Sequence, residues 1–110
     1  MSVIDLNTFN DLRETTGAQF VSELIDTFIE DSPSLINQMK KAISLLDAES
    51  FRRAAHTLKS NAATFGAMQL SSLARELESM GRENNLEIGN RLEVLEEAFQ
   101  KAKSQLIELR

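Results

Sequence analysis

Helix-breaking residues are scarce in this chain, and no stretch alternates apolar and polar residues for long enough to form a paired strand. The 110 residues include four glycines and one proline. Apolar residues instead recur three and four positions apart, which places them on one face of an α-helix. The sequence therefore predicts an all-α protein.

The first half of the chain is expected to form a short helix and then longer amphipathic ones. The short helix covers about residues 5–15 and ends at Gly17. Pro33 lacks an amide proton, so it should end or kink the helix that begins near Phe20. Ser32 as N-cap and Pro33 in the first turn would then start another helix. The inner apolar face is expected to contain Leu6, Phe9, Leu12, Phe20, Val21, Leu24, Ile25, Phe28, Ile29, Leu35, Ile36, Met39, Ile43 and Leu46.

The second half predicts a helical hairpin and a last long helix. Asp47 is the expected N-cap of a helix that runs to Phe65 and stops at Gly66, and the next helix ends near Gly81. The core residues of this half are expected to be Phe51, Ala54, Ala55, Leu58, Ala62, Phe65, Leu70, Leu73, Ala74, Leu77, Met80, Leu92, Leu95, Ala98, Phe99, Ala102, Leu106 and Leu109. Short connections between long helices favour an antiparallel four-helix bundle with an additional short N-terminal helix, in one domain over residues 1–110.

Composition narrows the classes of partner and compartment. The net charge of −5 would repel a phosphate backbone, so we expect no nucleic acid partner. The chain has no cysteine and neither a signal peptide nor an apolar run of membrane-spanning length, which predicts a cytoplasmic protein without a membrane anchor. The opening Met1-Ser2 favours a free-standing protein.

His56, the single histidine, is predicted to face away from the core. Its helical phase is roughly opposite the apolar stripe, so the imidazole should be in water. Lys59 and Ser60 follow at the i+3 and i+4 positions, which share one helix surface with it. A neutral imidazole nitrogen is available near pH 7 and can accept a phosphoryl group, whose charge a nearby ammonium would stabilise.

Several enzyme classes lack the residues they require. There is no glycine-rich phosphate loop, and a carboxylate-bridged di-iron site needs Glu-x-x-His pairs, whereas Arg53 stands three residues before His56. An exposed helical histidine has nothing that encloses it as a serine triad would require. The glutamates of the later helices are interpreted as solvated charges. We therefore expect no metal site, no cofactor of the protein's own and no autonomous catalysis.

The run His56-Thr57-Leu58-Lys59, followed by a small residue and then by Gly66, resembles the signature of histidine-containing phosphotransfer (Hpt) domains. Further landmarks are similar in the same order along nearly the whole chain: Ile4-Asp5-Leu6, Phe28-Ile29-Glu30-Asp31-Ser32-Pro33, Leu46-Asp47 and Leu77-Glu78. The resemblance implies a helical bundle that relays phosphoryl groups to and from aspartates of response-regulator receiver domains, with a hybrid sensor histidine kinase as a further partner. It departs from the family at Ser60, where glycine is usual.

The same resemblance implies roles for individual residues. His56 would be the phosphoacceptor, Lys59 would steady the phosphoryl group, and Gly66 would be the turn glycine of the hairpin. Glu78 either orients the imidazole through one ring nitrogen or is an exposed helix charge. The residues expected at the partner-docking surface are Arg52, Ser60, Ala63, Arg75 and Glu78.

The expected function is therefore that of a phosphorelay intermediate, in which the receiver supplies Mg²⁺ and the acceptor pocket. Two alternatives remain open. One is the phosphoacceptor domain of a chemotaxis-type kinase, excised from a larger enzyme. The other is a non-phosphorylated helical adaptor that uses the same groove for binding alone.

Overall fold

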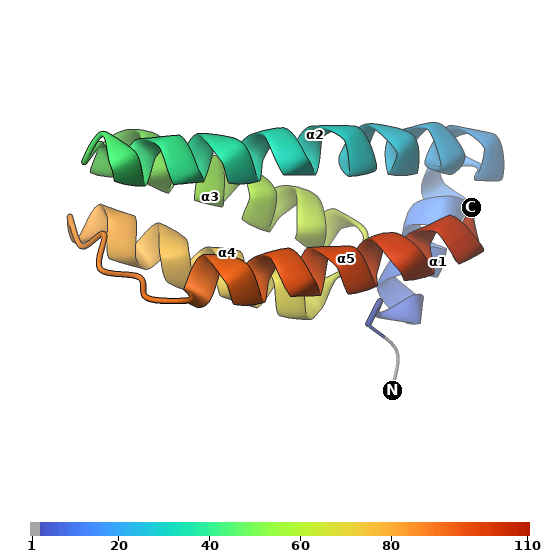
Figure 1. Cartoon of the computed structure of the whole chain (residues 1–110). Helices are drawn as coiled ribbons and strands as arrows, with labels where there is room; N and C mark the ends of the chain where they lie inside the picture. The colour runs from blue at the N-terminus through green and yellow to red at the C-terminus, as the bar shows by residue number, and fades with distance from the viewer. Residues whose placement is uncertain (1–2) are drawn as a thin grey trace.

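The structure, a computed structural model, describes residues 3–110, and all of its regular elements are helices (Figure 1). Met1 and Ser2, on which the interpretation of a free-standing start rests, lie outside the described residues. Within the described part of the chain, no helix is both long and apolar enough to cross a bilayer. The helices are α1 (Leu6–Thr16), α2 (Ala18–Ser44), α3 (Ala48–Thr64), α4 (Met68–Arg82) and α5 (Arg91–Leu109).

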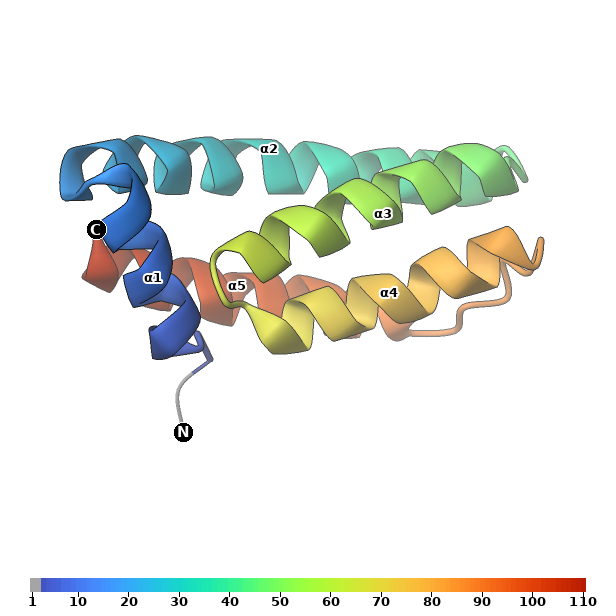
Figure 2. The same cartoon turned by 180° about the vertical axis from the view of Figure 1, so that it is seen from behind.

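Four of the helices form an elongated antiparallel bundle, and the molecule measures 41 × 25 × 19 Å. Helices α2 and α5 face the viewer in Figure 1, and α3 and α4 face the viewer in Figure 2. Helix α1 crosses the end of the bundle where α5 finishes and where α3 turns into α4 (Figure 2). The predicted all-α fold, a four-helix bundle with an additional short N-terminal helix, is confirmed.

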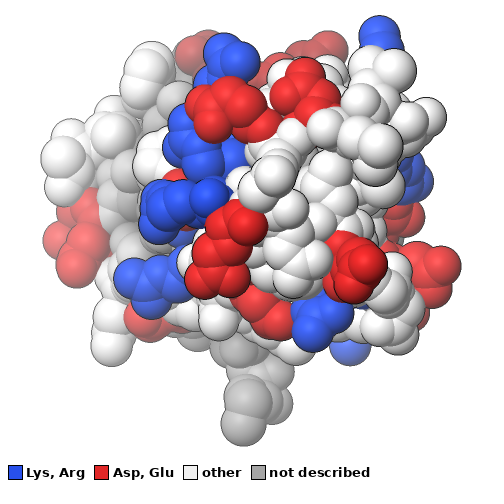
Figure 3. All heavy atoms as spheres, turned by 90° about the vertical axis from the view of Figure 1, so that its left-hand side faces the viewer, with Lys and Arg blue, Asp and Glu red and all other residues white. Residues whose placement is uncertain are grey.

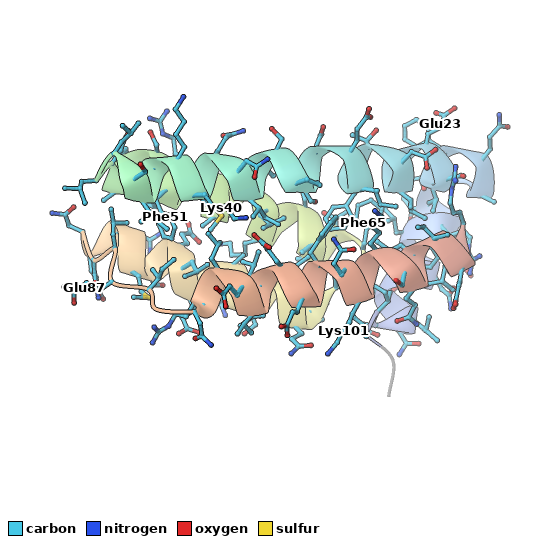
Figure 4. All side chains as sticks on the ribbon, in the orientation of Figure 1. Glu23, Lys40, Phe51, Phe65, Glu87 and Lys101 are labelled. Atoms are coloured by element: carbon cyan, nitrogen blue, oxygen red, sulfur yellow. The ribbon has the colours of Figure 1, made fainter. Side chains whose placement is uncertain are left out.

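The core lies between the helices and contains nearly all of the predicted apolar residues. Phe28 packs its ring 5.0 Å from that of Phe65 and 5.9 Å from that of Phe99, measured between centroids. Figure 4 shows Phe51 and Phe65 between the ribbons, whereas Glu23 projects outward from α2. Burying such aromatic side chains is a large part of what stabilises a bundle of this size.

Three residues expected on the inner face are exposed, because each lies at an end of a helix. Leu6, the first residue of α1, is 44% exposed. Phe20, in the first turn of α2, is 52% exposed. Leu46 is 82% exposed, because α2 ends at Ser44 and Leu46 has a positive φ of 56° in the turn that follows. All three residues follow the apolar spacing, but at the helix ends their side chains remain largely outside the core.

The prediction that Pro33 and Ser32 start a new helix is also wrong. Helix α2 runs unbroken for 27 residues, with Pro33 inside it. Ser32 is buried, and its hydroxyl donates to the carbonyl oxygen of Phe28 at 2.7 Å. Proline removes one hydrogen bond from a helix, but the apolar faces before and after it pack on the same core, and this packing outweighs the local loss.

Local residues explain where α3 begins and where the chain turns into α4. Asp47 accepts a hydrogen bond from the amide of Ser50 and caps α3, as the sequence predicts. Gly66 joins α3 to α4 with a φ of 82°, a conformation that favours glycine. Its carbonyl accepts the amide of Asp5 at 2.8 Å, which attaches the start of α1 to the hairpin turn.

Candidate functional site

His56 lies on the outer side of α3, as its helical phase predicts, but its ring is not free on both sides. The imidazole is 54% exposed, and its Nδ1 atom lies 2.7 Å from Oε2 of Glu78 on α4. The neighbouring Ala55 and Leu58 are fully buried in the core. One ring nitrogen is thus held by the protein, and the other edge of the ring faces outward.

Glu78 is buried, although a helix carboxylate is ordinarily solvated. Its side chain is only 4% exposed. The alternative that treats Glu78 as an exposed helix charge is therefore wrong, and so is its assignment to the exposed docking surface. The carboxylate lies beneath that surface, in the position expected of a group that orients the imidazole.

Three donors from two helices surround the Glu78 carboxylate. His56 and Arg82 both approach Oε2, at 2.7 and 3.2 Å, and the ammonium of Lys59 lies 2.7 Å from Oε1. Lys59 lies one turn after His56, as the sequence predicts, and its ammonium is paired with Glu78 while its side chain is 27% exposed. Arg82 is not among the predicted site residues, although its i+4 spacing from Glu78 is a signal for the pair.

The donors also determine the protonation of the site. Burial raises the pKa of Glu78, but hydrogen bonds from Lys59 and His56 outweigh burial and hold this pKa below its ordinary value. An ionised carboxylate can only accept hydrogen bonds, so Nδ1 of His56 must carry the proton that it shares with Glu78. In the neutral ring, the lone pair is then on Nε2, the outward-facing nitrogen.

Small residues allow the two helices to approach closely enough for this contact. Ala74 and Gly81 flank Glu78 on the buried side of α4. A Cβ atom at Gly81 would lie 3.1 Å from side-chain atoms of Phe51 and Arg52 on α3. The hydroxyl of Ser71 donates to the carbonyl of Lys59 at 3.0 Å, which fixes the register of the pair. The small residues spaced around Glu78 were a sequence signal that a neighbouring helix covers it.

A shallow groove of about 370 Å³ lies between α3 and α4 next to Lys59. Three predicted docking residues contribute to it: Ser60 and Arg75 are exposed, and Ala63 is half-buried. Among residues 3–110, Arg75 makes no ion pair. The groove is lined by Lys59, Ser60, Ala63, Met68, Ser71, Ser72 and Arg75.

Charge is distributed unevenly over the molecule. Helices α3 and α4 together carry five basic and three acidic residues, a net charge of +2, although the whole chain has a net charge of −5. Figure 3 shows Lys and Arg gathered down one side of the end of the bundle. Arg52 is less available than predicted, because its guanidinium is bonded to both carboxylate oxygens of Glu49, at 2.6 and 3.0 Å. Gly66 lies at the hairpin turn and contacts Asp5, with the structural role that was expected.

In the part of the chain that the structure describes, no three His, Cys, Asp or Glu side chains come together as a metal site would require. The groups available for chemistry are one outward imidazole nitrogen, a buried carboxylate behind the ring and two cations that share this carboxylate.

Comparisons with known proteins agree with this arrangement. Residues 23–107 match the Hpt domain family. The structure is similar to the crystal structure of histidine-containing phosphotransfer protein B from Pseudomonas aeruginosa PAO1, with a TM-score of 0.77. The sequences are 24% identical, over 96% of this chain and 89% of that one, so this likeness concerns the fold. A comparison with the curated proteins gives no significant match.

Proposed function

The chain belongs to the Hpt domain family, and from this premise we propose that it carries phosphoryl groups between aspartates of response-regulator receiver domains, with His56 as the phosphoacceptor. The observation that carries the proposal is the bond between Nδ1 of His56 and Glu78, because it leaves Nε2 as the outward nucleophile. Within residues 3–110 no other histidine exists to compete for this role.

In the proposed step, the lone pair of Nε2 attacks the phosphorus of an aspartyl phosphate held by the receiver. The new N–P bond forms as the P–O bond breaks, and the bonding electrons remain on the departing aspartate carboxylate. The imidazole ring becomes positive, because Nδ1 keeps its proton. The Glu78 carboxylate stabilises this charge from behind the ring, and its stabilisation needs no movement. Donation to a second receiver aspartate reverses the same bonds.

Lys59 is the proposed partner of the phosphoryl oxygens. Its ammonium already lies at the site, paired with the same carboxylate that holds the imidazole. A phosphoryl group adds up to about two negative charges, which favour a nearby cation. Phosphoryl transfer depends mainly on positioning and on charge neutralisation, and His56, Glu78 and Lys59 supply both.

The receiver is proposed to approach across α3 and α4. The groove beside Lys59 offers Ala63 and Met68 as apolar contacts and Arg75 as a cation, and Ser60 is small enough to let another surface come close. In this proposal the Mg²⁺ ion belongs to the receiver, and the chain contributes the nucleophile. We place the role in the cytoplasm, which the cysteine-free sequence allows.

Transfer of labelled phosphate from a phosphorylated receiver domain tests the proposal. The parent should become labelled, with the label stable in alkali and lost in acid, and His56→Asn should take up none. Asparagine is the preferred variant, because its amide nitrogen can replace Nδ1 as the donor to Glu78 and preserve the fold. Circular dichroism and the thermal midpoint provide the check on folding.

Other outcomes of the experiment favour the alternatives. Label that enters from ATP and a histidine kinase catalytic domain, but from no receiver, would support the excised kinase domain. A parent that accepts label from neither source would be a binding adaptor. Label that persists in His56→Asn would overturn the assignment of the phosphoacceptor.

A further inference from the structure

Lys59 is engaged by Glu78 before any phosphoryl group arrives, so turning toward a phosphoryl group would weaken that ion pair. In the structure its ammonium lies 2.7 Å from Oε1 of Glu78. If it turned to a phosphoryl group on His56, the carboxylate would lose one of its cations while remaining almost fully buried. A buried charge that loses its partner is costly, so Glu78 would draw Lys59 back unless another cation took its place.

Arg82 is placed to be that cation. It is on the same helix as Glu78, one turn later, and its guanidinium lies 3.2 Å from Oε2. Its side chain is 63% exposed, so it can move without disturbing the core. The guanidinium offers five donors and can bind both oxygens of a carboxylate at once.

We propose that Arg82 is a positioning residue that takes over Glu78 when Lys59 turns to the phosphoryl group. This inference rests on the proposed function, because the exchange occurs only when His56 is phosphorylated. Without phosphate, Glu78 is shared by Lys59 and Arg82. With phosphate, Lys59 faces the phosphoryl oxygens and Arg82 alone neutralises Glu78, which still holds Nδ1 of the ring.

The charges of the two states support this exchange. Before transfer, the neutral imidazole, one carboxylate and two cations have a total charge of +1. Phosphorylation adds a positive ring charge and up to about two negative charges on the phosphoryl oxygens, so the total falls to about zero. Each anion then has a cation of its own, and no cation has to come from outside the two helices.

Phosphorus NMR of the full chain tests the exchange without a receiver. Phosphoramidate is the donor: its P–N bond breaks with release of ammonia as the bond to Nε2 forms. The step of the pH titration in which the phosphoryl oxygens, and not Nδ1, take up a proton reports whether a cation lies beside the phosphoryl group. A neighbouring cation favours the dianion and lowers the midpoint of this step. If the role of Arg82 were purely structural, its removal would change the midpoint of thermal unfolding but not the midpoint of the phosphoryl titration.

We expect Arg82→Ala to raise the titration midpoint, because Lys59 is drawn back to Glu78. The expected change is about two- to fivefold in proton affinity, the range of a partly exposed ion pair. Arg82→Lys should restore most of the parental midpoint. Arg91→Ala is the matched control, because it removes the same charge from an exposed ion pair to Glu76 on α4 and should leave the midpoint unchanged.

A second substitution distinguishes the exchange from direct contact between Arg82 and phosphate. In a Lys59→Ala background no ammonium remains to be released, so adding Arg82→Ala should shift the midpoint no further. An equal shift in both backgrounds would mean that Arg82 touches the phosphoryl group itself, and would overturn the proposal. A titration midpoint in the single variant Arg82→Ala that equals the midpoint of the parent would also overturn the proposal. A parent that takes up no phosphate would instead contradict the proposed function, and the exchange would fall with it.

Discussion

Nδ1 of His56 and Oε2 of Glu78 lie 2.7 Å apart although 22 residues separate them in the chain. Helices α3 and α4 bring the two side chains together, and the turn at Gly66 sets how the helices align. The contact joins an exposed ring to a buried carboxylate. It therefore links the chemistry of the surface to the packing of the hairpin.

Replacing the buried carboxylate of Glu78 should therefore lower the stability of the protein. We expect Glu78→Gln to lower the free energy of unfolding at pH 7 by about 1–2 kcal/mol, near the lower end for hydrogen bonds to charged groups, because all three donors keep access to water. The pKa of Glu78 is lowered in the folded protein, so its stabilisation is present above the unfolded value of about 4.5 and is lost as the pH falls through the folded value. Urea unfolding at pH 7 measures the stability with Glu78 ionised, and unfolding below pH 4 measures it as Glu78 becomes protonated.

The difference in the free energy of unfolding between the parent and Glu78→Gln should thus shrink toward zero in acid. Glu76→Gln is the matched control, since Glu76 is exposed on the same helix and pairs with Arg91. It should change stability little at either pH. A stability difference for Glu78→Gln that stays constant from pH 7 to pH 3 would contradict the role of an ionised carboxylate.

Ser60 tests where a receiver docks. Ser60→Trp should slow transfer from a phosphorylated receiver at least tenfold, because the indole would fill the space in front of the groove, while stability changes by less than about 0.5 kcal/mol at this exposed position. Labelling by phosphoramidate should remain normal, since a small donor does not need the groove. Transfer kinetics with the two donors make the comparison.

Two further variants complete this test. Ser60→Gly should preserve transfer at a cost of about 0.5 kcal/mol in helix stability. Ser104→Trp introduces the same bulk on the exposed side of α5 and should leave transfer from the receiver unchanged. If Ser60→Trp and Ser104→Trp behaved alike, the receiver would have to approach by another face.

The sequence was sufficient where one helix decides the outcome. The outward direction of His56 depends on the phase of α3 alone, and the N-cap at Asp47 depends on the next three residues. Both predictions are local, and both agree with the structure. The Gly66 turn is of the same kind, because few residues other than glycine adopt a φ of 82°.

The sequence was insufficient where a second helix decides the outcome. From the sequence, Glu78 could either orient the imidazole or be a solvated charge, and the approach of α3, which buries it, decides between the two. Leu46 is apolar and fits the spacing, yet no helix covers it. Ser32 and Pro33 form a good helix start by local rules, but the core on both sides keeps α2 continuous. In each case, packing against a distant segment outweighs the local preference.

Variants at Pro33 and Ser32 test whether α2 is continuous, because a continuous helix and a helix start at these residues predict opposite changes in the free energy of unfolding. In a continuous helix, Pro33→Ala restores a backbone donor and should raise the free energy of unfolding by about 1–3 kcal/mol, after allowing for the greater freedom of the unfolded chain. At Ser32, alanine should be tolerated better than aspartate, because a carboxylate would be buried there. A helix start would reverse this order, since aspartate is a good N-cap and alanine a poor one. Thermal or urea unfolding of the three variants decides between them.

Gly66 provides a test of how α1 is held against the bundle. A Cβ atom at this position would lie 2.7 Å from the carbonyl oxygen of Asp5, so the start of α1 would have to move. Gly17 also has a positive φ, of 92°, but a Cβ atom there would have nothing within 4 Å. Because φ is positive at both positions, alanine at either should cost about 1–3 kcal/mol in backbone strain, and alanine at Gly66 should also displace Asp5.

Only alanine at Gly66 should also loosen α1. The Asp5 amide donates to the Gly66 carbonyl at 2.8 Å, so hydrogen exchange at Asp5 reports this contact directly. We expect Gly66→Ala to make the Asp5 amide exchange faster than in Gly17→Ala, even when the two variants are equally stable overall. Because His56 lies about three helical turns before Gly66, labelling by phosphoramidate should persist in both variants. Equal protection of the Asp5 amide in the two variants would mean that the contact with Gly66 does not hold α1 in place.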